Sequence, residues 1–140
     1  MNLDNQTIAE WNELGFYYEY DNSFKQWRFF GSKKGIYKFS DLIKSYSSKL
    51  SNDAISEHIH LGPYYYLKIM TWNEPMVSKN SIAGSLSDLA RLSKLISDRT
   101  SSTEIGNIFI ISTDYSITST ATMLFVIMSD SFIPASIEFK

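Results

Sequence analysis

Two amphipathic segments, separated by strand-like aromatic stretches, constrain the fold most. In the first, apolar residues recur every three or four positions, as on one face of a helix: Ile36, Phe39, Ile43, Tyr46 and Leu50. Ser32 precedes this segment and is a suitable N-cap. In the second, Ser85 and Asp88 form a capping-box pattern before apolar residues that continue at helical spacing to about Arg99. We therefore predict two main helices.

Strand-like patterns surround these two helices. Residues 16–30 contain two aromatic stretches around the polar turn 21–23, which predicts a hairpin. A strand is predicted to begin near Tyr64, with Tyr65, Leu67, Ile69 and Thr71 on its buried face. Further strands are expected at 76–79 or around Ile82, at 108–112 and at 120–128, the last apolar on both faces like a covered central strand.

The order of these elements indicates the fold class. A short helix at 7–13 is followed by strand, strand, helix, strand, helix, strand and strand. Runs of adjacent strands favour an antiparallel or mixed sheet with helices on one face over a doubly wound parallel sheet. We expect an α+β fold with one sheet of about five to six strands. No internal repeat or linker is visible, so residues 1–140 are predicted to form a single domain.

Composition excludes several classes of protein. The chain has no cysteine, which excludes a disulfide framework, thiolate catalysis and cysteine-ligated zinc, and suits a reducing cytosol. Its first residues carry several acids and lack the basic start and apolar core of a signal peptide. No apolar run approaches the roughly 18 residues of a membrane span. We expect a cytoplasmic protein with no membrane partner.

His58 and His60 are the only histidines, and their spacing places both on one side of a strand. With Glu57 nearby they are compatible with metal binding or acid–base chemistry. Three interpretations stay open: structural or surface residues, contacts to a partner, and a metal or acid–base site. Because no second histidine or cysteine cluster exists, we predict neither a metal nor another cofactor.

Motifs of common enzyme classes are missing. No G-x-S-x-G elbow surrounds a serine, so no activated nucleophile is recognisable. The GSKKG segment at 31–35 has glycines and lysines but lacks the spacing of a phosphate-binding P-loop. We therefore expect a protein that is not an enzyme.

Charge is distributed unevenly along the chain. The net charge is −2, yet residues 1–22 hold five acids and no base, and residues 23–50 hold seven bases and one acid. Aromatic residues interleave with the basic segment, as in proteins that stack single-stranded nucleic acid: Tyr17, Trp27, Phe30 and Tyr64–Tyr66. The acidic neighbouring segment and a pI of about 5.6 argue against this. A small nucleic-acid-binding or regulatory module is thus the alternative function, and nucleic acid is not an expected partner.

Four segments together resemble the small immunity proteins of bacterial polymorphic-toxin and contact-dependent growth inhibition systems: ELGFYYEYD, WRFFGSKKGIYKFSDLI, SEHIHLGPYYYLKIMTW and IAGSLSDLARL. The similarity extends from about Glu13 to Leu95 and weakens in the serine- and threonine-rich last third. It implies a cytosolic, non-catalytic antitoxin, without a cofactor, that binds the C-terminal toxin domain of one effector and blocks its active site or substrate surface. In that family the third segment is a mark of the fold.

The resemblance also implies a surface that binds the toxin. Immunity proteins of nuclease toxins often mimic the polyanionic substrate with clustered carboxylates, and complementary potential accelerates association. We predict the interface at the densest acidic group with its aromatic anchors: Glu10, Trp11, Glu13, Tyr17, Glu19 and Asp21, with Tyr18 as a further anchor. For an acidic or membrane-active toxin, the alternative is the basic helix with Lys33, Lys34, Lys38 and Lys44.

Overall fold

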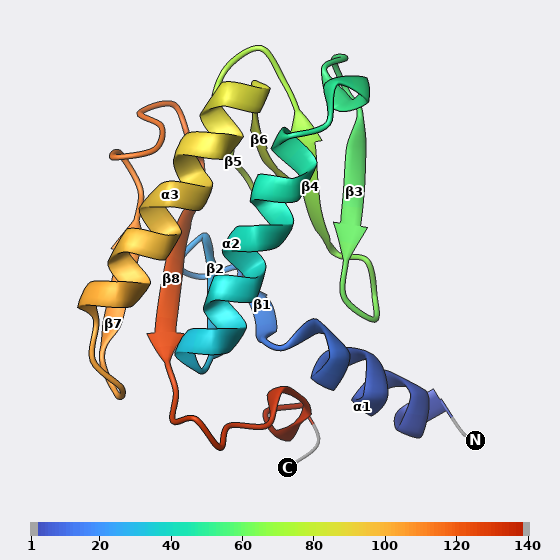
Figure 1. The fold of residues 1–140 in the computed structure, drawn as a ribbon, viewed down its shortest axis with the longest axis vertical. Coiled ribbons are helices and arrows are strands. Elements are labelled where there is room, and N and C mark those ends of the chain that lie inside the picture. The colour runs from blue at the N-terminus through green and yellow to red at the C-terminus, as the bar shows by residue number, and fades with distance from the viewer. Residues whose placement is uncertain (1–2, 139–140) are drawn as a thin grey trace.

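Three α-helices and two four-stranded sheets make up the described residues 3–138 of the computed structural model (Figure 1). The helices are α1 Leu3–Leu14, α2 Lys33–Ser47 and α3 Leu86–Ser102. The strands are β1 Tyr17–Asp21, β2 Gln26–Gly31, β3 His58–Leu61, β4 Leu67–Thr71, β5 Met76–Val77, β6 Ile82–Gly84, β7 Ile108–Ile111 and β8 Thr122–Ile127. Short 3-10 helices lie at Leu50–Asn52 (η1) and Pro134–Ser136 (η2). The α+β class, the two main helices and the first hairpin are confirmed.

Each sheet consists of two antiparallel hairpins joined by a central parallel pair. The first sheet has the order β1-β2-β8-β7, with β2 parallel to β8. The second has the order β3-β4-β6-β5, with β4 parallel to β6. The expected count of five to six strands is only roughly matched, because β3, β5 and β6 are only two to four residues long, and the strands form two mixed sheets instead of one. Such short strands show too little alternation to be counted from sequence.

The two halves of the chain share one topology. Hairpin β1–β2, helix α2 and hairpin β3–β4 correspond in order to hairpin β5–β6, helix α3 and hairpin β7–β8. At both strand-to-helix junctions a glycine ends the strand and a serine caps the helix: Gly31–Ser32 and Gly84–Ser85. The two serines have matching extended backbones, with φ −62° and ψ 166° against φ −65° and ψ 167°. The sequence did not reveal this repeat, because the two halves share the order of their elements and no visible pattern of residues.

A reciprocal pair of serines lies where α2 and α3 pack side by side (Figure 1). The Ser40 hydroxyl donates to the Ser93 carbonyl oxygen at 2.7 Å, and the Ser93 hydroxyl donates to the Ser40 carbonyl oxygen at 2.8 Å. Both residues are buried. Their small side chains allow the helices to approach closely, and each hydroxyl is satisfied by the opposite backbone.

Replacing Ser40 by valine should therefore separate the helices and lower the free energy of unfolding by about 1–3 kcal/mol, as overpacking does. Chemical denaturation measures the change. Ser45→Val, the same substitution at an exposed position of α2, is the matched control and should stay within about 0.5 kcal/mol of its helix-propensity cost. Equal effects of the two variants would contradict the close helix contact.

The core behind these helices is built on stacked phenylalanines. Phe29 of β2 stacks on Phe39 of α2 and on Phe125 of β8, with ring centroids 4.8 and 4.7 Å apart, and Phe125 stacks on Phe109 of β7 at 4.6 Å. All four are buried. The predicted helical stripe is confirmed for its first four residues, whereas Leu50 lies in η1 and is 85 % exposed.

Strand β8 lies between β2 and β7, as expected of a central strand. Only its alternate residues are fully buried, namely Met123, Phe125 and Ile127, because the helices cover one face of the sheet. The expectation of cover on both faces was wrong. No helix among residues 3–138 is both long enough and apolar enough to cross a membrane.

Candidate functional site

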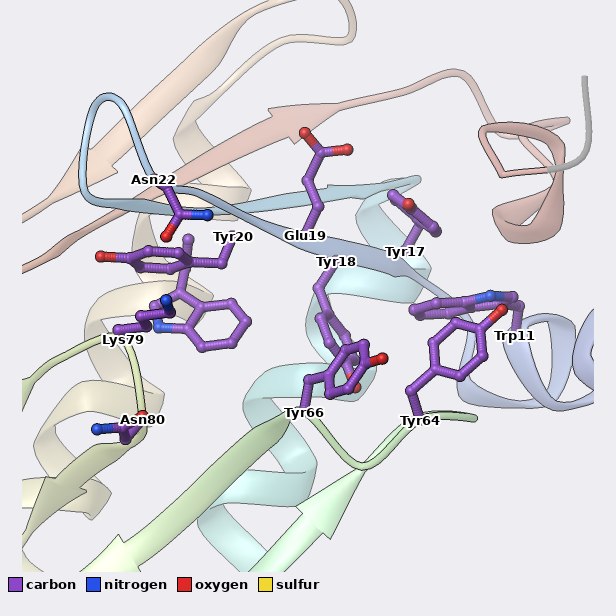
Figure 2. A pocket seen from close by; sticks show the side chains of 11 residues that line it. Trp11, Tyr17, Tyr18, Glu19, Tyr20, Asn22, Tyr64, Tyr66, Lys79 and Asn80 are labelled. Atoms are coloured by element: carbon purple, nitrogen blue, oxygen red, sulfur yellow. The ribbon is translucent and has the colours of Figure 1, made fainter.

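A cavity of about 500 Å³, walled largely by aromatic rings, opens beside β1 (Figure 2). Three parts of the chain supply its aromatic residues, namely α1, the β1–β2 hairpin and the loop 62–66 between β3 and β4: Trp11, Tyr17, Tyr18, Tyr20, Trp27, Tyr64 and Tyr66. We call this cavity the aromatic pocket. It lies where the first sheet meets a loop of the second.

Residues Tyr17 to Tyr20 of β1 all line the pocket, although their side chains leave the strand on alternate sides. Figure 2 shows the Tyr18 side chain directed toward Tyr66, while Glu19 extends from the other side of the strand. Tyr18 is buried, and its hydroxyl donates to the Leu61 carbonyl oxygen. Burial raises the pKa of Tyr18 to about 12, so its hydroxyl remains a donor at neutral pH. This contact ties β1 to β3 and fixes one wall of the pocket.

Glycine is required at position 62 beside this tyrosine. Gly62 has a φ of +87°, and a Cβ atom there would lie 2.6 Å from the Tyr18 hydroxyl oxygen. A side chain would thus be both strained and in collision. The Gly62–Pro63 interruption predicted from sequence marks this close approach.

Trp11 forms the wall of the pocket on the α1 side. Only 1 % of it is exposed, its indole nitrogen donates to Glu138 Oε2 at 2.6 Å, and its ring lies 4.6 Å from that of Tyr17. Trp11 was predicted to be an interface anchor. It instead supports the pocket wall from inside the fold, and it offers a partner little exposed surface.

The opposite wall is a loop and not the strand that was predicted to begin near Tyr64. Strand β4 starts only at Leu67, although Leu67, Ile69 and Thr71 are buried as expected. Tyr65 has a φ of +58° and is 64 % exposed, which interrupts the alternation. Its neighbours Tyr64 and Tyr66 line the pocket with their rings stacked, centroids 5.4 Å apart.

Glu138 links the C-terminal segment to the pocket and was missed in the sequence. Its carboxylate accepts hydrogen bonds from both the Trp11 indole and the Tyr64 hydroxyl. These partners lie 127 and 74 positions away along the chain, so no local pattern announces the contact. The hydrogen bond to Glu138, followed by desolvation, raises the pKa of Tyr64 to about 12.

Glu138→Gln should move the pKa of Tyr64 back toward its usual value near 10, because the amide no longer favours the neutral phenol by its charge. The raised pKa means that the Tyr64–Glu138 bond is fully present below about pH 10 and is lost as the pH rises through about 12. Tyrosine-labelled NMR titration measures the shift. Asp130→Asn, at an exposed carboxylate of the same segment, is the control and should leave Tyr64 unchanged.

The predicted acidic interface residues do not form one cluster. Glu19 lies at the pocket with Trp11 and Tyr17, whereas Glu10 and Glu13 on α1 line a neighbouring shallow depression together with Tyr65. Asp21, at the far end of β1, forms an ion pair with Arg28 at 3.2 Å and accepts a hydrogen bond from the Phe24 backbone at 2.9 Å. Asp21 is thus the least available of the four carboxylates.

Two carboxylates act on the hydroxyl group of Tyr17. Burial raises the pKa of Tyr17, and the charges of Glu19 and Glu138 raise it further. Both carboxylates therefore act on the outer edge of the aromatic pocket. At the other end of the pocket the polar residues are two amides and a cation in place of carboxylates: Asn22, Asn80 and Lys79.

Two lysines of the alternative basic surface on α2 donate hydrogen bonds to backbone carbonyl oxygens of other elements. Lys33 Nζ donates to the Ser101 carbonyl oxygen at 3.4 Å, and Lys38 Nζ donates to the Glu13 carbonyl oxygen. Lys34 and Lys44 are exposed. The lysines of α2 therefore form a less concentrated basic surface than their grouping in the sequence indicated.

His58 and His60 lie on β3, exposed and on the same side, as their spacing predicted. Within residues 3–138 no group of three or more metal-ligating side chains exists.

Comparisons of the chain with protein-family models, with curated proteins and with solved structures gave no match.

Proposed function

We propose that this chain is an immunity protein, an antitoxin that binds the toxin domain of a cognate contact-dependent or polymorphic toxin, a nuclease, and occludes its active site. The observation that carries the proposal is the aromatic pocket with carboxylates at its outer edge. Exposed aromatic rings around a preformed hollow are the usual centres of binding energy in protein interfaces.

Three of the four segments that resemble immunity proteins also contribute residues to this pocket. ELGFYYEYD contains Tyr17 to Tyr20, WRFFGSKKGIYKFSDLI begins with Trp27, and SEHIHLGPYYYLKIMTW contains Tyr64 and Tyr66. The resemblance and the pocket therefore share most of the pocket's aromatic residues. This agreement supports a role for these segments in binding as well as in the fold.

Internal hydrogen bonds make the pocket rigid. Trp27 donates through its indole nitrogen to the Ser78 carbonyl oxygen at 2.8 Å, and Trp11 and Tyr18 are held by Glu138 and Leu61. A partner that inserts a side chain would lose little free energy in ordering these walls, because they are already ordered. Such a site suits tight, specific inhibition.

Carboxylates around the pocket favour a basic partner. Glu19 lies on the outer side of β1, and Glu10 and Glu13 lie on the adjacent helix α1. The active sites of nucleases must attract a polyanion, so they present a positive potential to which such a surface is complementary. Association is then fast at low salt and slower as salt is raised.

The direct test begins with the gene immediately upstream: where it encodes a large secreted protein, binding of this chain to the C-terminal domain of that protein is measured. We expect a one-to-one complex with a Kd in the nanomolar range, about −12 kcal/mol, and loss of the toxin's nuclease activity in that complex. A Kd weaker than about 10 μM, or full nuclease activity in the complex, would overturn the proposal.

Charge reversal distinguishes the two candidate surfaces. Glu19→Lys should slow association with the toxin domain about tenfold or more, because it places a positive charge against a basic partner. Lys44→Glu, the matched reversal on the exposed face of α2, should leave the rate within about twofold. Stopped-flow fluorescence at low and moderate salt measures both rates, and the opposite ranking would place the toxin on α2.

A second function is favoured by the polar end of the pocket. Lys79, with the amides of Asn22 and Asn80, lies beside the rings of Tyr20 and Trp27. Rings and a cation together suit a stacked nucleotide of a single strand. Quenching of tryptophan fluorescence by short oligonucleotides, weakened by salt, would support this module, and no retention on an oligonucleotide column would exclude it.

A further inference from the structure

We propose that His58 and His60 form a two-imidazole binding site for a late first-row divalent cation, Zn²⁺ in particular. They lie on β3, the edge strand of the second sheet, two residues apart and on the same exposed side. Neither residue lines the aromatic pocket, although His60 contacts Tyr65 of the loop that carries Tyr64 and Tyr66.

Hydrogen bonds assign the tautomer of both rings. His58 Nδ1 lies 2.8 Å from the Ser56 carbonyl oxygen, and His60 Nδ1 lies 2.9 Å from the Tyr65 carbonyl oxygen. Because a carbonyl oxygen can only accept, each Nδ1 carries the proton. In the neutral imidazole, Nε2 then carries the lone pair, which is the form in which histidine binds a metal.

The separation of the rings matches a shared tetrahedral ion. Their centroids are 5.0 Å apart. A zinc ion about 2.0–2.1 Å from Nε2 lies about 3.2 Å from the centroid of that ring. Two such centroids 5.0 Å apart subtend about 103° at the ion, near the tetrahedral angle of about 109°. A shared ion then requires both Nε2 atoms to face a common point between rings whose planes are inclined at 88°.

The same hydrogen bonds hold the rings in place before any ion binds. Ser56 and Tyr65, which accept them, both have positive φ angles, +74° and +58°, and neither is a glycine. Each imidazole therefore braces one of the turns that flank β3. Ligands fixed by an outer hydrogen bond lose little freedom on binding a metal, which is the usual role of a carbonyl behind a metal-bound histidine.

The described residues supply two ligands to the ion. Since residues 3–138 contain no group of three or more ligating side chains, water or a side chain of a bound protein would fill the other positions. Imidazole selects zinc, nickel and copper over magnesium, which prefers oxygen ligands.

The test is titration of the full chain with ZnCl₂, followed by calorimetry and by NMR of the imidazole nitrogens. We expect one ion per chain, shifts at both Nε2 resonances with Nδ1 still protonated, and no binding of Mg²⁺. His58→Asn and His60→Asn are the matched variants, because the asparagine amide can replace the Nδ1 donor while removing Nε2. Each should weaken Zn²⁺ binding on the order of tenfold or more.

Two controls keep the outcome unambiguous. Without metal, the asparagine variants should melt close to the wild type if the hydrogen bonds to Ser56 and Tyr65 are retained. Should a variant fail to fold, the Nε2 shifts of the wild type decide the matter alone. Absence of Zn²⁺ binding at about 1 mM, or shifts at only one imidazole, would overturn the proposal.

Discussion

Tyr66→Ala is expected to weaken binding of the toxin domain by about 30-fold or more, which corresponds to about 2 kcal/mol. Tyr66 lines the aromatic pocket, its ring stacks on that of Tyr64, and 69 % of the residue is exposed. Truncation therefore removes contact area for a partner without opening the core. Titration calorimetry or biolayer interferometry with the toxin domain measures the loss.

Two variants control this experiment. Tyr66→Phe keeps the ring and should bind within about threefold of the wild type. Ile105→Ala truncates another exposed apolar side chain, 51 % exposed in the turn between α3 and β7, and should not change binding. If Tyr66→Ala binds like the wild type, the toxin does not use the pocket, and the exposed lysines of α2 become the surface to examine.

Phe29→Ala should lower the free energy of unfolding by about 3–5 kcal/mol, the usual range for a buried phenylalanine. Phe29 has no exposed surface and stacks between Phe39 and Phe125, so its removal leaves a cavity that joins β2, α2 and β8. Urea denaturation followed by tryptophan fluorescence measures the change.

Phe24→Ala is the matched control for this loss of stability. Phe24 lies in the β1–β2 turn, is 72 % exposed and has the Arg28 guanidinium 5.5 Å from its ring centroid. Its loss should cost about 1 kcal/mol at most, the worth of an exposed cation–π contact. If Phe29→Ala were as mild as Phe24→Ala, the stack would not be the centre of the core.

The proposed binding surface and the core thus use different rings. The stacked phenylalanines lie under the helices, whereas Tyr64 and Tyr66 lie on a loop with water on one side. This separation allows the exterior of the pocket to be altered while the fold stays intact. It also means that the Tyr66 and Phe29 experiments test independent statements.

Local elements of this fold could be predicted because their causes are local. Ser85 and Asp88 satisfy each other's backbone amides at 3.1 and 3.0 Å, as the capping box at the start of α3 requires. Ile36, Phe39 and Ile43 repeat with helical spacing and are fully buried in α2. In both cases residues three or four positions apart determine the structure, so the order of the chain is sufficient.

The predicted interface was only partly recoverable from the chain. Trp11, Tyr17 and Glu19 do lie together at the pocket, because α1 leads directly into β1. Asp21 is partly neutralised by Arg28, its diagonal neighbour across the hairpin, and Trp11 is buried. Sequence proximity therefore brought Trp11, Tyr17 and Glu19 together but did not reveal the exposure of each side chain.

By itself the sequence determined the α+β class, the two main helices, the first hairpin and the alternating buried faces of the longer strands. Only the tertiary structure decided that eight strands form two sheets, that Tyr65 leaves the alternation, and that Glu138 joins Trp11 to Tyr64. The physical reason is range: helix periodicity and capping act over a few residues, whereas the pocket depends on contacts between segments far apart in the chain.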